Sequence, residues 1–263
     1  MTDNKTLSKK KESNVIPFDI AGLEADAGLG LQNVTQEDLA LPFLKILTAE
    51  AAETCGGEAR GGDIYNTVTQ EVFKGDVGIK VVPCIYQRRY VEWAPQGTQG
   101  APLNIYTPQD KTAGKMPKTE QRGDDRTDYI VGSDNYIETT AQHYVVVVDD
   151  EGRMETGLIT MKKTRLKKSK AWNSMMQSRV EMGKEGPFIP PAFAYVYNLT
   201  TEKQKNDKGQ WNTWKITLDG KVPSADIYNF CKAFAKSIED NNVIVKHEND
   251  EVTVEKDAGD SPF

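Results

Sequence analysis

The stretch that decides the fold is VGIKVVPCIYQRRYVEW, residues 77–93. β-branched and aromatic side chains recur along it with the alternation of a strand that lies on a core. It is much longer than an ordinary strand of about 5–6 residues, so we expect it to curve. Pro83 cannot donate to a β ladder, which predicts a sheet edge or a bulge at that position.

Two hairpins are predicted C-terminal to this strand. Residues 141–148 are predicted to form a buried strand and residues 155–163 the next strand, on either side of the turn 149–152. Residues 192–200 and 211–218 are likewise predicted to form strands around a turn containing Gly209. N-terminal to the long strand, residues 64–73 indicate a strand pair.

Two helices complete the pattern. Ser169 is predicted to cap the first, which carries Trp172 and ends by Gly183. Ser224 is predicted to cap the second, whose apolar stripe runs to Ile238.

The predicted order is strand, strand, strand, helix, strand, strand, helix. This order matches a mainly β, OB-fold-like five-stranded Greek-key barrel with a helix between strands 3 and 4 and a C-terminal helix. An α+β domain with a mixed antiparallel sheet is the alternative. Residues 94–139 lack periodicity and form a long first inter-strand loop. We expect a flexible arm at 1–35, the domain at 36–247 and a flexible acidic tail at 248–263.

Composition points to a reduced compartment. The three cysteines, Cys55, Cys84 and Cys231, are odd in number and widely spaced, which favours free thiols over a disulfide framework. No apolar run reaches the roughly 18–20 residues of a membrane span, and no apolar signal segment is visible at the N-terminus. These features predict a cytoplasmic protein that makes no membrane contact.

Charge is distributed unevenly along the chain. The total is 33 basic and 39 acidic residues, a net charge of −6. Residues 239–263 hold eight acids and two lysines, so they carry the whole excess and the rest is neutral. Between Lys162 and Lys184 there are eight basic residues and a single acid, Glu181. A basic stripe with an acidic tail is typical of a nucleic-acid binder.

The first candidate site is the basic run before Trp172. Cations contact phosphates and flat side chains stack on bases, so such a run suits a single strand. The alternative is a solvated loop, and for Trp172 the core is the favoured place. The run contains Lys162, Lys163, Arg165, Lys167, Lys168 and Lys170.

The second candidate lies on the long strand. Alternation places Tyr86, Arg88 and Tyr90 on one face and Arg89 and Trp93 on the other. The first set would form a base-stacking platform, or else an exposed face whose tyrosines shield the sheet.

The third candidate is the last hairpin, where Tyr195 and Lys215 are the positions that could reach a ligand. Its other aromatic residues are expected to stabilise the hairpin through cross-strand pairs.

Catalytic motifs are missing from the sequence. There are two histidines, neither with a partner at ligand spacing, and no Cys-x-x-Cys, HExxH, P-loop or Gly-x-Ser-x-Gly motif. We therefore expect no enzyme activity, no metal and no cofactor.

The C-terminal tip is short and acidic and ends in an aromatic residue. Asp257, Asp260, Pro262 and Phe263 would suit an apolar pocket with a basic rim on a partner. With the OB-like order and the basic-aromatic elements, this tip resembles that of phage-type single-stranded DNA-binding proteins. The resemblance implies sequence-independent coating of single-stranded DNA in replication and recombination. It also implies recruitment of replication proteins through Phe263, in the cytoplasm of a bacterial host.

The tip departs from the bacterial pattern at Gly259 and Ser261, which stand where acids or an aliphatic residue would be expected. Two alternatives stay open: a protein-interaction or virion-associated module, and a single-stranded RNA binder.

Overall fold

The computed structural model describes residues 20–34, 38–55, 57–98, 100–123, 125–207 and 209–240. The chain divides into one unit up to Leu39 and a second from Ala40 onward. The described part of the first unit contains a short exposed helix, α1 (Ile20–Ala25), within the stretch that we expected to be a flexible arm. All further description concerns the second unit.

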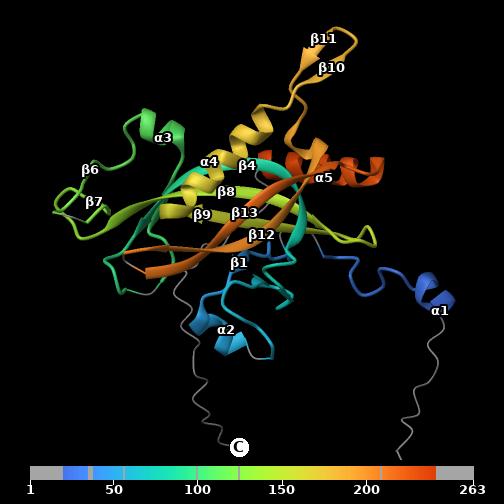
Figure 1. Ribbon diagram of the computed structural model, residues 1–263, viewed down its shortest axis with the longest axis horizontal. Coiled ribbons are helices and arrows are strands. Elements are labelled where there is room, and N and C mark those ends of the chain that lie inside the picture. The colour runs from blue at the N-terminus through green and yellow to red at the C-terminus, as the bar shows by residue number, and fades with distance from the viewer. Residues whose placement is uncertain are drawn as a thin grey trace, which may run out of the picture. The chain divides into compact units, whose positions relative to one another are not determined.

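A curled antiparallel sheet organises the second unit (Figure 1). Its five long strands lie in the order β13-β12-β4-β8-β9. Their bounds are β4 (Ile79–Trp93), β8 (Tyr136–Val148), β9 (Met154–Lys162), β12 (Tyr195–Asn206) and β13 (Gly209–Lys221). The long strand and both hairpins predicted from the sequence are therefore confirmed.

Strand β4 is central to this sheet. One edge pairs with β8 along most of its length, and the register shifts between Pro83 and Ile85, as expected for a bulge at proline. The other edge pairs with β12 only at its start and with β5 (Asn104–Tyr106) only at its end. Its middle, including Tyr86 and Arg88, has no ladder partner on that side within the described residues.

The mainly β class is confirmed, but a closed five-stranded barrel is not. In the described part of the chain no ladder joins β9 to β13, so the sheet remains a half-barrel. Helix α4 (Leu166–Gln177) contacts both of these strands. The gap between them is thus bridged by a helix in place of backbone hydrogen bonds.

A small sheet also helps to fill the gap between β9 and β13. It comprises β1 (Leu44–Ile46), β2 (Ile64–Asn66) and β3 (Val72–Phe73), and α2 (Ala49–Cys55) lies between its first two strands. Strand β1 contacts β9, and Leu44 and Ile46 are buried in the core.

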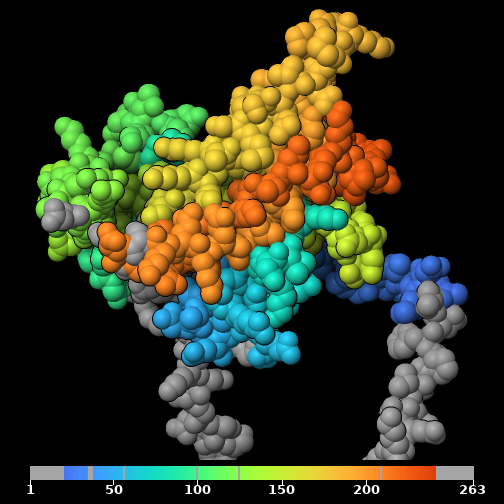
Figure 2. Space-filling model, viewed as in Figure 1, coloured from blue at the N-terminus to red at the C-terminus, as the bar shows by residue number. Residues whose placement is uncertain are grey.

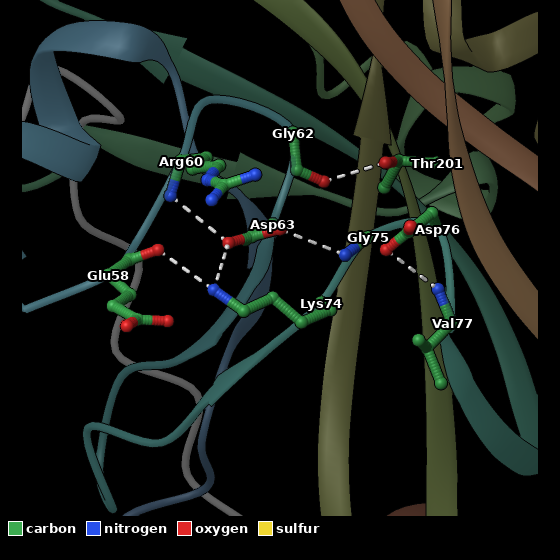
Figure 3. Close-up of polar contacts among 9 residues, drawn as sticks. All are labelled: Glu58, Arg60, Gly62, Asp63, Lys74, Gly75, Asp76, Val77 and Thr201. Atoms are coloured by element: carbon green, nitrogen blue, oxygen red, sulfur yellow. Dashed lines mark hydrogen bonds and ion pairs between the residues drawn. The ribbon is translucent and has the colours of Figure 1, made fainter.

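Buried Asp63 fixes the small sheet (Figure 3). Its carboxylate accepts hydrogen bonds from the backbone N–H groups of Gly75 and Arg60, both at 3.0 Å, and pairs with Lys74 Nζ at 3.4 Å. Burial raises the pKa of Asp63, but these donors outweigh it and hold the pKa below its usual value. The charged form is therefore retained.

The same corner ties the small sheet to β12. The Thr201 hydroxyl donates to Gly62 O at 2.6 Å (Figure 3). In addition, Thr201 N donates to Gly75 O at 2.7 Å. A Cβ at Gly75 would lie 2.1 Å from Gly62 O, so only glycine permits this approach.

The main sheet has a core on each face, because successive side chains of a strand point to opposite sides. Val81 and Val145 belong to the cluster beneath α4, whereas Val82 and Val146 belong to the cluster beneath α5 (Ala225–Glu239). The two helices thus cover opposite faces of the sheet.

The two helix starts differ from each other. Ser224 caps α5 as predicted, with its hydroxyl 3.2 Å from Ile227 N. Ser169 does not cap α4, which is a correction: the helix begins at Leu166, after the 3₁₀ turn η2 (Lys163–Arg165). Ser169 is buried inside the helix, because its hydroxyl bonds to a buried histidine.

The long loop is shorter and more structured than predicted. Strand β8 begins at Tyr136, not at residue 141, because its first residues pair with β4 and β7. The insertion contains β5, α3 (Pro108–Thr112), β6 (Thr119–Glu120) and β7 (Asp128–Ile130). A capping box between Thr107 and Asp110 starts α3.

A second correction concerns the glycines after α4. The helix ends at Gln177, and Gly183 and Gly186 instead form the last pair before the turn of the hairpin β10 (Glu181–Gly183) and β11 (Gly186–Phe188). This hairpin extends away from the sheet (Figure 1). The 3₁₀ turn η3 (Ala192–Ala194) follows it. None of the helices among the described residues has both the length and the apolar composition that a membrane span requires.

Candidate functional site

The α4 face of β4 carries a strip of alternating aromatic and basic side chains. We call Tyr86, Arg88 and Tyr90 the β4 strip. Interactions with the side chains of Tyr86, the larger cause, and Tyr90 raise the pKa of Arg88, and only 9% of Tyr90 is exposed. Lys111 of α3 lies 4.7 Å from the centre of the Tyr90 ring. Arg88 forms no ion pair with an acid among the described residues.

A half-open cavity of about 370 Å³ adjoins the strip at Tyr86. It lies between α4, the segment that joins β11 to η3, and strands β4 and β12. Its lining is mostly apolar and aromatic. The lining residues are Tyr86, Asn173, Met176, Gln177, Ile189, Pro190, Pro191, Ala192, Tyr195 and Tyr197.

A stack of buried rings supports the cavity. The Tyr86 and His143 rings are 5.1 Å apart, His143 and Trp172 are 4.6 Å apart, and Trp172 and Tyr197 are 5.8 Å apart. Burial lowers the pKa of His143 to about 3, and its Nε2 lies 2.8 Å from Ser169 Oγ. The imidazole is therefore neutral near pH 7, and Trp172 is a core residue, as favoured from the sequence.

Acids distant in the sequence neutralise much of the predicted basic run. Lys162 and Lys163 lie 3.0 and 3.8 Å from the carboxylate of Glu138, and Lys168 lies 2.7 Å from Glu202. Arg165 donates to the carbonyl oxygen of Asn212 at 3.3 Å. These contacts occupy four of the six cations of the run.

The remaining two cations, Lys167 and Lys170, are exposed on α4 and form no ion pair among the described residues. Lys170 shares a helical stripe with Asn173 and Gln177, both of which line the cavity. The helix therefore places at least one unpaired cation beside the cavity.

Other predicted residues point away from this face. Lys162 and Arg89 both pair with Thr140, and Lys215 pairs with Thr200, on the side of the sheet opposite the α4 core. Trp93 has the same orientation as Arg89, and only 4% of it is exposed. A base would find no open ring face on Trp93, and the other three residues lie on the face opposite the cavity. That these residues contact DNA stays a prediction.

Tyr195 lines the cavity and is also held by its neighbours. Its hydroxyl donates to Glu181, which in turn pairs with Lys221 at 2.8 Å. The bond to Glu181 raises the pKa of Tyr195. These contacts join the projecting hairpin to β12 and β13.

Sequence reasoning missed Asn173, Lys111 and the Ile189–Pro191 wall. Asn173 lies in a helix, Lys111 in the irregular insertion and the prolines in a connection, so no local pattern marked them. Arg179 was counted only as one charge of the basic stretch. Its charge acts on the hydroxyls of both Tyr195 and Tyr197, which places it near the cavity.

The predicted partner-binding residues Asp257, Asp260, Pro262 and Phe263 lie outside the described residues. Within the described ranges, no group of three or more His, Cys, Asp and Glu side chains is arranged to hold a metal ion.

Fold and site together define a mainly β protein with an aromatic and basic half-barrel face. The chain matches the family of Pam3 phage gp34-like proteins over residues 10–244 and belongs to that family, so it is a phage protein. No curated protein and no solved structure matches it.

Proposed function

We propose that this protein binds single-stranded DNA without reading its sequence and acts in phage replication and recombination. The carrying observation is the β4 strip, in which Arg88 lies beside Tyr86 and Tyr90 without an acidic partner among the described residues, and Tyr86 is the half-exposed ring that offers a stacking surface. Arginine contacts phosphate, and tyrosine rings stack on bases of any identity. Stacking needs bases with open faces, which a duplex does not offer.

The strand order supports reading the sheet as an opened OB-fold. In a closed OB barrel, the first strand pairs with the second and fourth, the second with the third, and the fourth with the fifth. The ladders β4–β8, β4–β12, β8–β9 and β12–β13 reproduce these four pairs. The loop between strands 1 and 2 is a ligand-binding loop in OB-folds, and here it supplies Lys111.

The direct test is fluorescence anisotropy with labelled oligo-dT, oligo-rU and a duplex of equal length. We expect oligo-dT to bind with log K falling by about 0.7 per phosphate neutralised as log salt rises. Binding that is insensitive to salt, or equal for the duplex, would contradict the proposal. A clear preference for oligo-rU would reassign the site to RNA.

Arg88→Gln tests the strip itself. We expect weaker oligo-dT binding and a smaller salt dependence, because one phosphate contact is lost. Lys80→Gln is the matched control, since it removes one charge from the same strand, where Lys80 pairs with Asp150 at 2.8 Å. Equal effects of the two variants would remove the strip from the site.

The tail contributes a separate part of the proposal, drawn from the sequence alone. Residues 248–263 are acidic and share a chain with the basic face, so they compete with DNA at high effective concentration. Deleting them is expected to tighten oligo-dT binding. Phe263→Ala is expected to leave DNA binding unchanged and to weaken capture of replication proteins.

A second function has one observation in its favour. The hairpin projects from the rest of the second unit (Figure 2). It exposes Met182 and Phe188, and the residues that flank it, Val180 and Ile189, are exposed as well, so that each of the four is 48–78% accessible. Clustered exposed apolar side chains mark protein contacts. A protein-interaction module of the phage particle would keep this hairpin but would show no oligo-dT binding.

A further inference from the structure

We propose that the cavity between α4 and the β11–η3 segment receives one unstacked nucleobase of the bound strand, with Arg179 facing the adjoining phosphate. This inference rests on the proposed function and adds a defined base subsite to it. At about 370 Å³ the cavity falls within the range of about 300–1,000 Å³ that is typical of ligand sites.

Two polar groups at the cavity indicate a ligand. Tyr197 is 0% exposed, and its hydroxyl has no partner of normal hydrogen-bond geometry among the described residues, where its polar neighbour is Arg179. The side-chain oxygen of Asn173 is likewise buried without a partner. Buried polar groups in native proteins are almost always hydrogen-bonded. A ligand that carries both donors and acceptors would satisfy them.

The shape and chemistry of the walls favour a flat aromatic ligand. Tyr86 and Tyr195 present rings, and Pro190 and Pro191 lie in the facing segment. A nucleobase combines a flat face with hydrogen-bonding edges, which match the hydroxyl of Tyr197 and the amides of Asn173 and Gln177. In a single strand, turning a base out of the stack costs least.

Arg179, the cation beside the cavity, would bind the phosphate of the nucleotide whose base enters the cavity. Arg179 influences the hydroxyls of Tyr195 and Tyr197 through its charge, and its Nε is buried without a partner. Arginine contacts phosphate with two parallel hydrogen bonds. Because Tyr86 belongs to both the β4 strip and the cavity wall, the strip and the cavity adjoin each other.

The test compares two tryptophan variants of the full chain. Gln177→Trp places a ring at the cavity, whereas Ser174→Trp places the same ring on an exposed position of α4 that does not line it. The probes are oligo-dT and an abasic oligomer of equal length. Removing one stacked base should weaken oligo-dT binding by about 5- to 150-fold in Gln177→Trp. Ser174→Trp should bind like the unchanged protein.

Tyr197→Phe gives a gentler second measurement. It removes only the hydroxyl, so oligo-dT affinity should fall by roughly 2- to 10-fold while abasic affinity stays constant. Equal oligo-dT affinities for Gln177→Trp, Ser174→Trp and the unchanged protein would overturn the base subsite and leave DNA binding intact. Failure of the unchanged protein to bind oligo-dT would overturn both proposals.

Discussion

The two helices that cover the main sheet differ in what they bury. Helix α5 covers its face with aliphatic and aromatic side chains, including Ile227, Phe234 and Ile238. Helix α4 buries Ser169 and Trp172 above a histidine, and polar atoms without partners lie beside it. Two helices on one sheet thus serve different ends. The α5 face is built for stability, whereas the α4 face retains buried polar atoms that have no hydrogen-bond partner among the described residues.

The largest expected effects come from removing one buried aromatic side chain from each helix, Trp172 from α4 and Phe234 from α5. Trp172→Ala and Phe234→Ala should each lower the free energy of unfolding by about 3–5 kcal/mol, because each leaves a cavity in a buried cluster. Urea denaturation measures this loss. The two variants should differ in binding once affinity is corrected for the folded fraction: Trp172→Ala removes the ring stack beneath the cavity and should weaken oligo-dT binding further, whereas Phe234→Ala should not. Equal binding losses would refute the division between the faces.

The second prediction uses pH to separate the faces. His143 has its pKa lowered by burial to about 3, so it stays neutral in the folded protein while the unfolded chain takes up a proton below about pH 6.5. Stability is therefore present above that pH and lost as the pH falls. The loss from this group at pH 4.5 is about 2–3 kcal/mol.

The loss of stability that His143 causes on acidification is measured by urea denaturation of the unchanged protein and of His143→Gln, each at pH 7 and pH 4.5. The variant should lose less stability on acidification. Phe234→Leu, on the other face, should follow the pH dependence of the unchanged protein. Parallel curves for the unchanged protein and His143→Gln would refute the prediction.

The third prediction concerns helix capping. Ser224→Ala should cost about 1 kcal/mol of unfolding free energy, because the N–H of Ile227 loses its acceptor. Ser224→Asp retains an acceptor and should preserve the stability measured in urea. DNA affinity should be unchanged in both variants, since α5 lies on the other face. A change in affinity would extend the site to that face.

The smallest expected effect on stability is at the exposed lysines. Lys170→Gln on α4 and Lys236→Gln on α5 should each change the unfolding free energy by less than about 0.5 kcal/mol. Only Lys170→Gln should reduce the salt dependence of oligo-dT binding, by about 0.7 in slope. Anisotropy titrations over a salt series provide the measurement, and equal slopes for the two variants would remove α4 from the interface.

Local patterns predicted a large part of the fold. The alternation in residues 77–93 predicted β4, and Pro83 predicted its bulge, because both depend on the geometry of a single strand. The Ser224 cap with its apolar stripe likewise predicted α5. Ser169 has the same capping chemistry but lies inside α4, because the buried His143 offers its hydroxyl a tertiary partner.

The candidate site was predicted only in part. The β4 strip followed from alternation along one strand. The basic run looked like a continuous cationic surface, yet Glu138 and Glu202 pair with three of its lysines from other strands. Trp93 looked available for stacking but is buried.

The sequence by itself determined the long strands, their hairpin partners and the C-terminal helix, because periodicity and capping act between residues close in the chain. Tertiary structure alone decided that the half-barrel is bridged by α4 and the small sheet, which lysines lack acidic partners, and where the cavity lies. Each of these depends on side chains brought together from distant segments. Whether these side chains come into contact depends on how the sheet curls and how the helices pack on it. No local pattern in the chain records either of these.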